Sequence, residues 1–344
     1  MRKVLVAGGA GYIGSTTCSA LIDSGHEPII LDSLITGREE FTKGRIFYKG
    51  DISDRKILTQ IFDDHPDIYC ALHFAALIVV PDSVSNPYCY YSENVGKSLE
   101  FYKILMDLGL KRIVFSSSAS IYDDVPGFMV TEESPLNPRS PYAKTKYMME
   151  SILKDFSNAY ALKGIALRYF NPIGADPKMR TGMQVLLPSH VVGKMVSTAT
   201  GKEKEFLITG VDWPTRDGSG IRDYIHVWDL AMAHVSAVER FDIVFEELSK
   251  DSGKSVSYTP INLGSGNGVT VKELVQAFEK VDKKPLPKRE APPRDGDVAG
   301  SYANADKAYK LLDWSTKLSI EEGISDALRW AAVRDRVISE KPTV

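Results

Sequence analysis

The sequence predicts an α/β protein with a doubly wound parallel sheet and a smaller domain of mixed α/β structure. Apolar runs typical of buried strands alternate with amphipathic segments over the first half of the chain, and this pattern changes after Asn171. The chain has 344 residues, of which 43% are hydrophobic and 25% are charged. This length and composition are typical of an ordinary globular protein of about two domains.

The strand-like runs of the first half define the expected sheet. They lie at Val4, Ile29, Ile46, Tyr69–Phe74, Ile113–Phe115 and Ile165–Tyr169, and helical patterns separate most of them. Right-handed crossovers bring the carboxyl ends of such strands to one edge, where ligands bind at the point at which the strand order reverses. We therefore expect functional residues at the ends of these strands or directly after them.

Prolines and glycines divide the chain into short pieces beyond residue 171. We expect residues 1–171 to form the first domain and residues 172–338 a second, substrate-binding domain, with segments near 222–262 returning to the first. A helix is predicted over 189–199. The polar stretch 248–256 is predicted to be a loop exposed to solvent.

A glycine-rich turn follows the first strand-like run. Gly8, Gly11 and Gly14 follow Lys3–Ala7, at the start of a helical stretch that begins near Tyr12. A turn without side chains lets backbone N–H groups at the positive end of the helix approach a pyrophosphate. This spacing is a variant of the Gly-x-Gly-x-x-Gly fingerprint, and its context favours a dinucleotide site of the Rossmann type. The alternative is a glycine turn in an α/β protein that binds no nucleotide.

Asp32 closes the second strand-like run, Pro28–Asp32. A carboxylate at this position can accept two hydrogen bonds from an adenosine ribose, and its charge repels a 2′-phosphate. The sequence therefore predicts NAD as the cofactor in preference to NADP.

Composition and cysteine content exclude several classes of partner. The formal net charge is −3, so we expect no nucleic acid. No stretch approaches the roughly 20 apolar residues that span a bilayer, so we expect no membrane partner. Cys18, Cys70 and Cys89 cannot form a complete set of disulfides, which favours a reducing cytoplasm. Cys70 and His73 lie within a strand-like run without a second pair at ligand spacing, so no metal is expected.

Tyr142 and Lys146 are four residues apart, directly after a Ser-Pro helix start, so both side chains share one helical face. They follow the hydroxyl cluster 116–118. The unperturbed pKa of a tyrosine is near 10, but a lysine ammonium and a positive nicotinamide ring nearby favour the phenolate. The pair is therefore a candidate for proton transfer. The alternative is a surface helix with an incidental pair.

Six blocks of sequence carry a family resemblance. They are 8–15, 73–76, 115–122, 140–144, 168–175 and 220–227. Together they resemble the UDP-glucose 4-epimerases of the extended short-chain dehydrogenase/reductase class, and the likeness extends from residue 1 to about residue 335.

The resemblance implies a reaction. Tyr142 takes the proton of the sugar 4-hydroxyl while hydride leaves C4 for NAD⁺, Lys146 holds the nicotinamide ribose, and Ser118 hydrogen-bonds the reacting oxygen. The 4-keto sugar then turns its other face and receives the hydride back. Because no net redox change occurs, NAD stays tightly bound.

The resemblance also assigns binding residues. For the cofactor they are Gly8, Gly11, Tyr12, Ile13, Gly14, Asp32, Asp51, Ile52, Phe74, Ala75, Ala76, Asn94, Ser116, Tyr142, Lys146 and Tyr169. For the UDP-sugar they are Ser118, Tyr142, Tyr169, Asn171, Arg222, Arg294, Asp297 and Ser301. Arginines offer forked donors to phosphate oxygens, and Asp297 can accept from ribose hydroxyls. A homodimer is implied, with the Tyr142 helix and a helix over 90–108 packing against their copies.

Four positions differ from the family or vary within it. Ile78 replaces a lysine, Val185 an asparagine and Thr209 an aromatic residue common in relatives. Ser301 stands where relatives restricted to plain hexoses tend to carry tyrosine, and a small residue leaves room for an acetamido group. We therefore expect activity on UDP-GlcNAc and UDP-GalNAc as well as on UDP-glucose and UDP-galactose.

Two other functions compete with epimerisation. A nucleotide-sugar 4,6-dehydratase needs an acid and a base for loss of the 6-hydroxyl; the resemblance places them directly after Ser118, where this chain has Ala119 and Ser120. A non-catalytic protein that senses NAD would be expected to lack the tyrosine or the lysine, and both are present.

Overall fold

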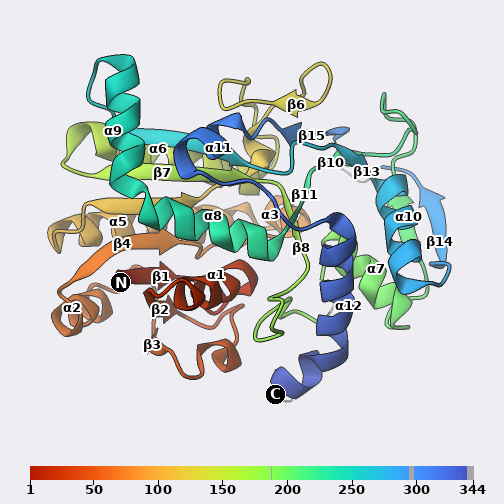
Figure 1. The fold of residues 1–344 in the computed structure, drawn as a ribbon, viewed down its shortest axis with the longest axis horizontal. Helices are drawn as coiled ribbons and strands as arrows, with labels where there is room; N and C mark the ends of the chain where they lie inside the picture. The colour runs from red at the N-terminus through yellow and green to blue at the C-terminus, as the bar shows by residue number, and fades with distance from the viewer. Residues whose placement is uncertain (187, 294–297, 339–344) are drawn as a thin grey trace.

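The computed structural model describes residues 1–186, 188–293 and 298–338. Its centre is a parallel sheet of seven strands in the order β12-β7-β5-β4-β1-β2-β3 (Figure 1). The strands are β1 (Lys3–Ala7), β2 (Glu27–Asp32), β3 (Ile46–Lys49), β4 (Ile68–His73), β5 (Arg112–Ser116), β7 (Lys163–Tyr169) and β12 (Tyr258–Leu263). The last of these comes from the second half of the chain and pairs with β7 at the sheet edge.

Helices cover both faces of this sheet, each over its own apolar core. Side chains alternate along β1, so Val4 and Val6 belong to one core while Leu5 and Ala7 belong to the other. The first core contains α1 (Tyr12–Asp23), α8 (Val227–Glu239), α9 (Phe241–Ser252) and α11 (Asp306–Leu312). The second contains α2 (Arg55–Asp64), α5 (Lys97–Asp107) and α6 (Pro141–Ala159). This arrangement confirms the predicted doubly wound sheet.

The smaller part of the molecule lies at the right of Figure 1. It contains α7 (Val191–Ala199), α10 (Val271–Asp282) and α12 (Ile320–Val337), which share a third core. A four-stranded sheet has the order β13 (Val269–Thr270), β10 (Ile221–Arg222), β15 (Gly300–Ala303), β6 (Met129–Val130). Two further pairs join β9 (Phe206–Thr209) to β14 (Lys288–Ala291) and β8 (Asn171–Ile173) to β11 (Tyr224–His226). The division of the chain near residue 171 remains a prediction.

Two local predictions differ from the structure. The stretch 248–256 is not wholly a loop, because α9 continues to Ser252 and ends at Gly253 with φ 66°. Phe241, Val244 and Phe245 have helical spacing and form the buried apolar face of α9. The last residues of the helix are polar, so the sequence pattern gave no sign that the helix continues through them. The expected helix over 90–108 is interrupted, since α4 (Pro87–Tyr90) is followed by the π-helical turn Tyr91–Gly96 before α5 begins.

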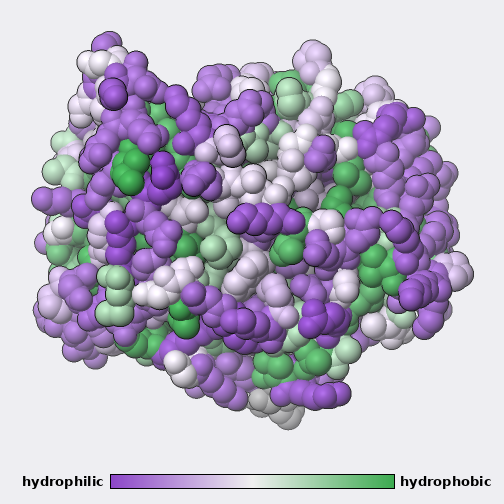
Figure 2. All heavy atoms as spheres, in the orientation of Figure 1, coloured by the Kyte–Doolittle hydropathy of each residue, from purple (hydrophilic) through white to green (hydrophobic). Residues whose placement is uncertain are grey.

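The face that carries α1 and α8 is mostly hydrophilic, with apolar side chains in small separate patches (Figure 2). Within the described residues, no helix combines the length and apolar character needed to cross a membrane.

Candidate active site

The carboxyl ends of the central strands bring the predicted site together. Gly8 follows β1, Asp32 ends β2, Phe74 follows β4, Ser116 ends β5 and Tyr169 ends β7. Because all these strands are parallel neighbours, the five residues lie along one edge of the sheet.

Two of the three glycines in the turn have no room for a side chain. A Cβ on Gly8, whose φ is 84°, would lie 2.6 Å from the amide nitrogen of Ala75. A Cβ on Gly14 would lie 2.2 Å from the carbonyl oxygen of Gly8. Gly11 is the N-cap of α1 and supplies no side-chain cap, so the first-turn amides can meet an anion. This cradle fits the pyrophosphate of a dinucleotide.

Asp32 is buried and held by backbone amides. Its two carboxylate oxygens accept hydrogen bonds from the amide of Ala10 at 2.9 Å and that of Leu34 at 2.8 Å. Burial raises the pKa of Asp32, while these two amides oppose the rise. Each oxygen keeps a further lone pair, which fits the two hydroxyls of a ribose.

Three of the predicted cofactor residues pack around the start of α1. The Tyr12 hydroxyl donates to the carbonyl of Gly174 at 2.7 Å, which links α1 to the segment after β8. Ile13 and Phe74 pack against the core of the α1 and α8 face. The ring of Phe74 lies 4.7 Å from the ring of His234, centroid to centroid, so α8 supports this wall.

The remaining cofactor candidates lie beyond β3 and β4. The amide of Ala75 donates to the carbonyl of Ala7 at 3.0 Å, and Ala76 follows it, partly buried. Asp51 pairs with Lys97 at 2.6 Å, and beside it Ile52 is buried in the core of the α2 and α5 face. Burial disfavours the charge of Asp51, but the hydrogen bonds from Lys97 and Ser53 together outweigh it and lower the pKa of Asp51 below its usual value.

Asn94 lies in the π-helical turn and links two segments of the site. Its side-chain oxygen accepts from the amide of Leu77 at 2.8 Å, and its nitrogen donates to the carbonyl of Leu77 at 2.9 Å. The same nitrogen donates to Thr145 of α6 at 3.1 Å. Asn94 therefore joins the segment after β4 to the helix of Tyr142.

The Tyr142 and Lys146 pair lies at the start of α6, which Ser140 caps through its hydroxyl. The Lys146 ammonium donates to the carbonyl of Ser116 at 2.8 Å and lies 5.9 Å from the centroid of the Tyr142 ring. Burial lowers the pKa of Lys146 to about 7, although Glu150 opposes this.

The tyrosine itself is less acidic than expected. Burial raises the pKa of Tyr142 above its usual value, and a hydrogen bond with Ser118 only partly offsets the rise. The expectation that Lys146 and a positive nicotinamide ring together favour the phenolate remains a prediction.

Two more hydroxyls lie next to this pair. The hydroxyls of Ser116 and Tyr169 are hydrogen-bonded to each other, and burial raises the pKa of Tyr169. Ser118 caps a short turn through the amide of Ser120 at 3.2 Å. The structure thus brings Ser116, Ser118, Tyr142 and Tyr169 together at the ends of β5 and β7.

The predicted UDP-sugar residues of the smaller part lie on paired strands. Asn171 of β8 donates through its side chain to the carbonyl of Asp223 at 3.3 Å. Arg222 of β10 lies opposite Ser301 of β15, which is partly buried. Arg294 and Asp297 lie outside the described residues.

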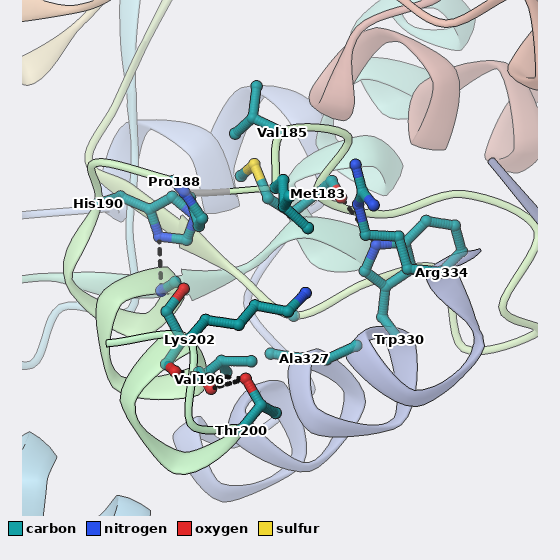
Figure 3. A pocket seen from close by; sticks show the side chains of 15 residues that line it. Met183, Val185, Pro188, His190, Val196, Thr200, Lys202, Ala327, Trp330 and Arg334 are labelled. Carbon is teal, nitrogen blue, oxygen red and sulfur yellow. Dashed lines mark hydrogen bonds between the residues drawn. The ribbon is translucent and has the colours of Figure 1, made fainter. Parts of the chain in front are cut away.

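The three positions that depart from the family are all at least partly exposed to solvent. Ile78 is 65% exposed and Val185 is 39% exposed, while Thr209 ends β9 and is partly buried. Val185 also lines a pocket between α7 and α12, together with His190, Lys202 and Trp330 (Figure 3).

Sequence reasoning missed two buried carboxylates that support the site. Asp223 follows Arg222 and binds the backbone of Ser265, Gly266 and Ala303. Glu150 lies one turn of α6 beyond Lys146 and pairs with Arg168. The four-residue spacing that singles out Lys146 also reaches Glu150, so a signal for this second residue was present.

Comparison with known proteins decides the family. Residues 4–246 match the model of the NAD dependent epimerase/dehydratase family. The chain belongs to this family. It is 40% identical to the UDP-glucose 4-epimerase of Bacillus subtilis (strain 168) over 337 residues, which is 95% of this chain and 96% of that protein.

Solved structures of family members have the same fold. The UDP-glucose-4-epimerase from Stenotrophomonas maltophila with bound NAD and formylated UDP-arabinopyranose superposes with a TM-score of 0.88 at 34% identity, covering 98% of this chain and 99% of that one. The enzyme from Bifidobacterium longum in complex with NAD⁺ and UDP gives 0.88 at 32% identity, covering 98% and 100%. The predicted fold class, epimerase family and NAD dependence are thereby confirmed.

Proposed function

We propose that this member of the family interconverts UDP-glucose and UDP-galactose by oxidation at C4, rotation of the 4-keto sugar and reduction on its other face. The observation that carries the proposal is the grouping of Tyr142, Lys146 and Ser118 at the sheet edge that also holds the glycine turn and Asp32.

NAD⁺, when bound, supplies the hydride acceptor for C4. The amides after Gly11 hold its pyrophosphate, and Asp32 accepts from the hydroxyls of its adenosine ribose. Because the carboxylate of Asp32 is buried and negative, a 2′-phosphate at the same place is disfavoured. Lys146, whose ammonium is anchored by the carbonyl of Ser116, holds the nicotinamide ribose.

The protein moves the proton. Tyr142 removes the proton of the sugar 4-hydroxyl, and Ser118 keeps the reacting oxygen at the phenol. Burial raises the pKa of Tyr142, so a positive nicotinamide ring beside the phenol would favour its phenolate. Proton abstraction would then be favoured when the cofactor is oxidised.

We propose that the substrate range includes UDP-GlcNAc and UDP-GalNAc. Support comes from Ser301, a small and partly buried side chain opposite Arg222 in the sheet register. An acetamido group needs the volume that a bulky ring at this position would fill. Asn171 and Arg222, with Arg294 and Asp297, are the proposed contacts to the UDP portion.

The competing functions have less support. Ala119 and Ser120 occupy the short turn after Ser118 and offer no carboxyl group for the loss of a 6-hydroxyl, so a 4,6-dehydratase is disfavoured. A non-catalytic NAD-sensing protein is disfavoured because Tyr142 and Lys146 are both present and adjacent to the predicted cofactor site.

We also propose a homodimer in the cytoplasm. The layer formed by α3 (Val80–Ser85), α4, α5 and α6 exposes apolar side chains, among them Val84, Leu99, Tyr147 and Met148. A second copy seated on this layer would bury them. The buried thiols of Cys18 and Cys70 are free, as expected in a reducing compartment. Sedimentation of a Leu99→Glu, Met148→Glu variant tests the dimer, which predicts conversion to a monomer; an unchanged mass would exclude this interface.

The function is tested with purified protein, the four UDP-sugars and no added NAD. Substrate deuterated at C4 should give product that keeps the label, because the hydride returns to the same carbon. Tyr142→Phe should lose epimerisation by orders of magnitude while NAD remains bound. Loss of the label to solvent, or release of a 4-keto-6-deoxy product, would contradict the proposal.

A further inference from the structure

Three successive serines at the end of β5 each contact a different residue of α6. The hydroxyl of Ser118 hydrogen-bonds to Tyr142, and the carbonyl of Ser116 accepts from Lys146 at 2.8 Å. Between them, the hydroxyl of Ser117 donates to the carboxylate of Glu150. The three partners on α6 are spaced four residues apart and therefore share one face of the helix.

Glu150 is also bound to two other strands. Its carboxylate accepts from Arg168 of β7 at 2.9 Å through Nε and at 2.6 Å through Nη2. The hydroxyl of Tyr258 of β12 donates to the same carboxylate at 3.0 Å. Arg168 in turn donates to the hydroxyl of Tyr122 at 2.9 Å. One carboxylate thus connects α6 to the ends or sides of three adjacent strands.

Burial makes these contacts costly to break. Glu150 is 3% exposed and Arg168 is 4% exposed, so neither charge can exchange its partner for water. A sliding or tilting movement of α6 would break several charge-assisted hydrogen bonds at once, and the cost of an unpaired buried charge opposes it. The network therefore fixes where α6 sits along the serine run.

We propose that Glu150 is a positioning residue for the epimerase reaction, which holds α6 so that Tyr142 stays at Ser118 and Lys146 stays at the carbonyl of Ser116. This inference rests on the proposed function, because it assigns a role relative to those catalytic groups. Because the carboxylate of Glu150 is buried among Ser117, Arg168 and Tyr258, it acts through the helix.

The charge of Glu150 has a second effect on the same pair. Burial lowers the pKa of Lys146 to about 7, and the carboxylate opposes that shift. Among the groups that face the lysine are His73 of β4, whose pKa is lowered by burial and by Lys146, and Tyr142 on its own helix. Arg168, Tyr258 and Tyr102 of α5 face the carboxylate. Neutralising Glu150 therefore lowers the pKa of Lys146 further.

The central test is Glu150→Gln, which keeps the shape and removes the charge. We expect kcat for UDP-glucose to fall on the order of 10- to 100-fold with KM nearly unchanged. The alkaline limb of the kcat profile should move to lower pH, because Lys146 loses its proton earlier. Glu150→Asp, which keeps the charge, should restore the position of that limb. A folded Gln variant with kcat within about twofold of the parent would overturn the proposal.

A double variant separates positioning from stability. The single variant Glu150→Gln leaves Arg168 as an unpaired buried charge, which should lower the thermal midpoint of unfolding. Removing both charges with Glu150→Leu and Arg168→Met leaves no unpaired buried ion, so the midpoint should return towards that of the parent. We expect kcat to remain low, whereas recovery of kcat together with stability would assign Glu150 a merely structural role and refute the inference. Asp155→Asn, an exposed carboxylate of α6, is the matched control and should behave as the parent. Failure of the unmodified protein to epimerise any UDP-sugar would instead reject the proposed function.

Discussion

Arg222 lies opposite Ser301 in the register of β10 and β15, and its guanidinium binds the two residues that directly precede β15. Nη1 donates to the carbonyl of Ala299 at 2.8 Å, and Nη2 donates to that of Val298 at 3.0 Å. The proposed phosphate-binding arginine therefore also determines where the backbone of the proposed specificity residue runs.

Substitution of Ser301 by tyrosine tests the proposed substrate range. Because the ring would occupy the space of an acetamido group, Ser301→Tyr should lower kcat/KM for UDP-GlcNAc by about 10- to 200-fold and leave UDP-glucose turnover nearly intact. Product analysis with both sugars measures this. Ser301→Ala is the control and should keep both activities; equal losses on the two sugars in the tyrosine variant would contradict the specificity role.

Asp223 also binds the backbone of β15. Its fully buried carboxylate accepts from the amide of Ser265 at 2.8 Å and from that of Ala303 at 3.1 Å. Asp223→Asn replaces an acceptor by a donor there, and should reduce the free energy of unfolding by about 1–3 kcal/mol. KM for UDP-glucose should rise more than kcat falls, because β15 shifts at the substrate side. Denaturant unfolding and steady-state kinetics test this, with the exposed Asp212→Asn as control.

The glycine turn should not tolerate a methyl group. In Gly14→Ala the new Cβ would lie 2.2 Å from the carbonyl oxygen of Gly8, so the turn must open. We expect purified protein to carry much less NAD, measured by release of the nucleotide and chromatography. Gly96→Ala adds the same methyl group 3.9 Å from its nearest neighbour and should retain the cofactor. Full NAD content in the Gly14 variant would show that the pyrophosphate binds elsewhere.

Buried histidines should make the fold sensitive to acid. Burial lowers the pKa of His73 to about 3 and that of both His190 and His234 to about 4. The unfolded chain binds these protons below about pH 6.5 whereas the folded chain does not, so stability should fall as pH drops from 6.5 towards 4. Each histidine contributes up to about 1.4 kcal/mol per pH unit in this window.

Urea unfolding at several pH values measures that slope. His73 accepts or donates hydrogen bonds with Tyr102 at 3.1 Å and Ser98 at 3.3 Å, so His73→Asn keeps a polar side chain there. Its slope should be smaller than that of the parent by about one proton. An identical slope would mean that His73 takes up its proton in the folded protein as readily as in the unfolded chain.

Much of the architecture follows from local sequence. The strand-like run Lys3–Ala7 is β1, and the run ending at Asp32 is β2. Ser140 and Pro141 mark the start of α6, which places Tyr142 and Lys146 on one face as their spacing requires. These features are predictable because the signals lie within a few residues of each other.

Other features depend on distant partners. β6, at residues 129–130, pairs with β15, which lies about 170 residues later in the chain. No local sequence pattern predicts this pairing. The continuation of α9 past Leu248 depends on the burial of its first turns against the main sheet. The raised pKa of Tyr142 and the lowered pKa of Lys146 arise from desolvation, which is a property of the packed site.

By itself, the sequence determined the strand and helix types, the glycine turn, the acidic end of β2 and the helical spacing of the proton-transfer pair. Those depend on residue type and on short-range geometry. Only the tertiary structure decided which groups the buried carboxylates of Glu150 and Asp223 bind, and that Arg222 lies opposite Ser301. The reason is physical: a buried charge is defined by partners that folding brings from elsewhere in the chain, and a linear pattern does not contain their distances.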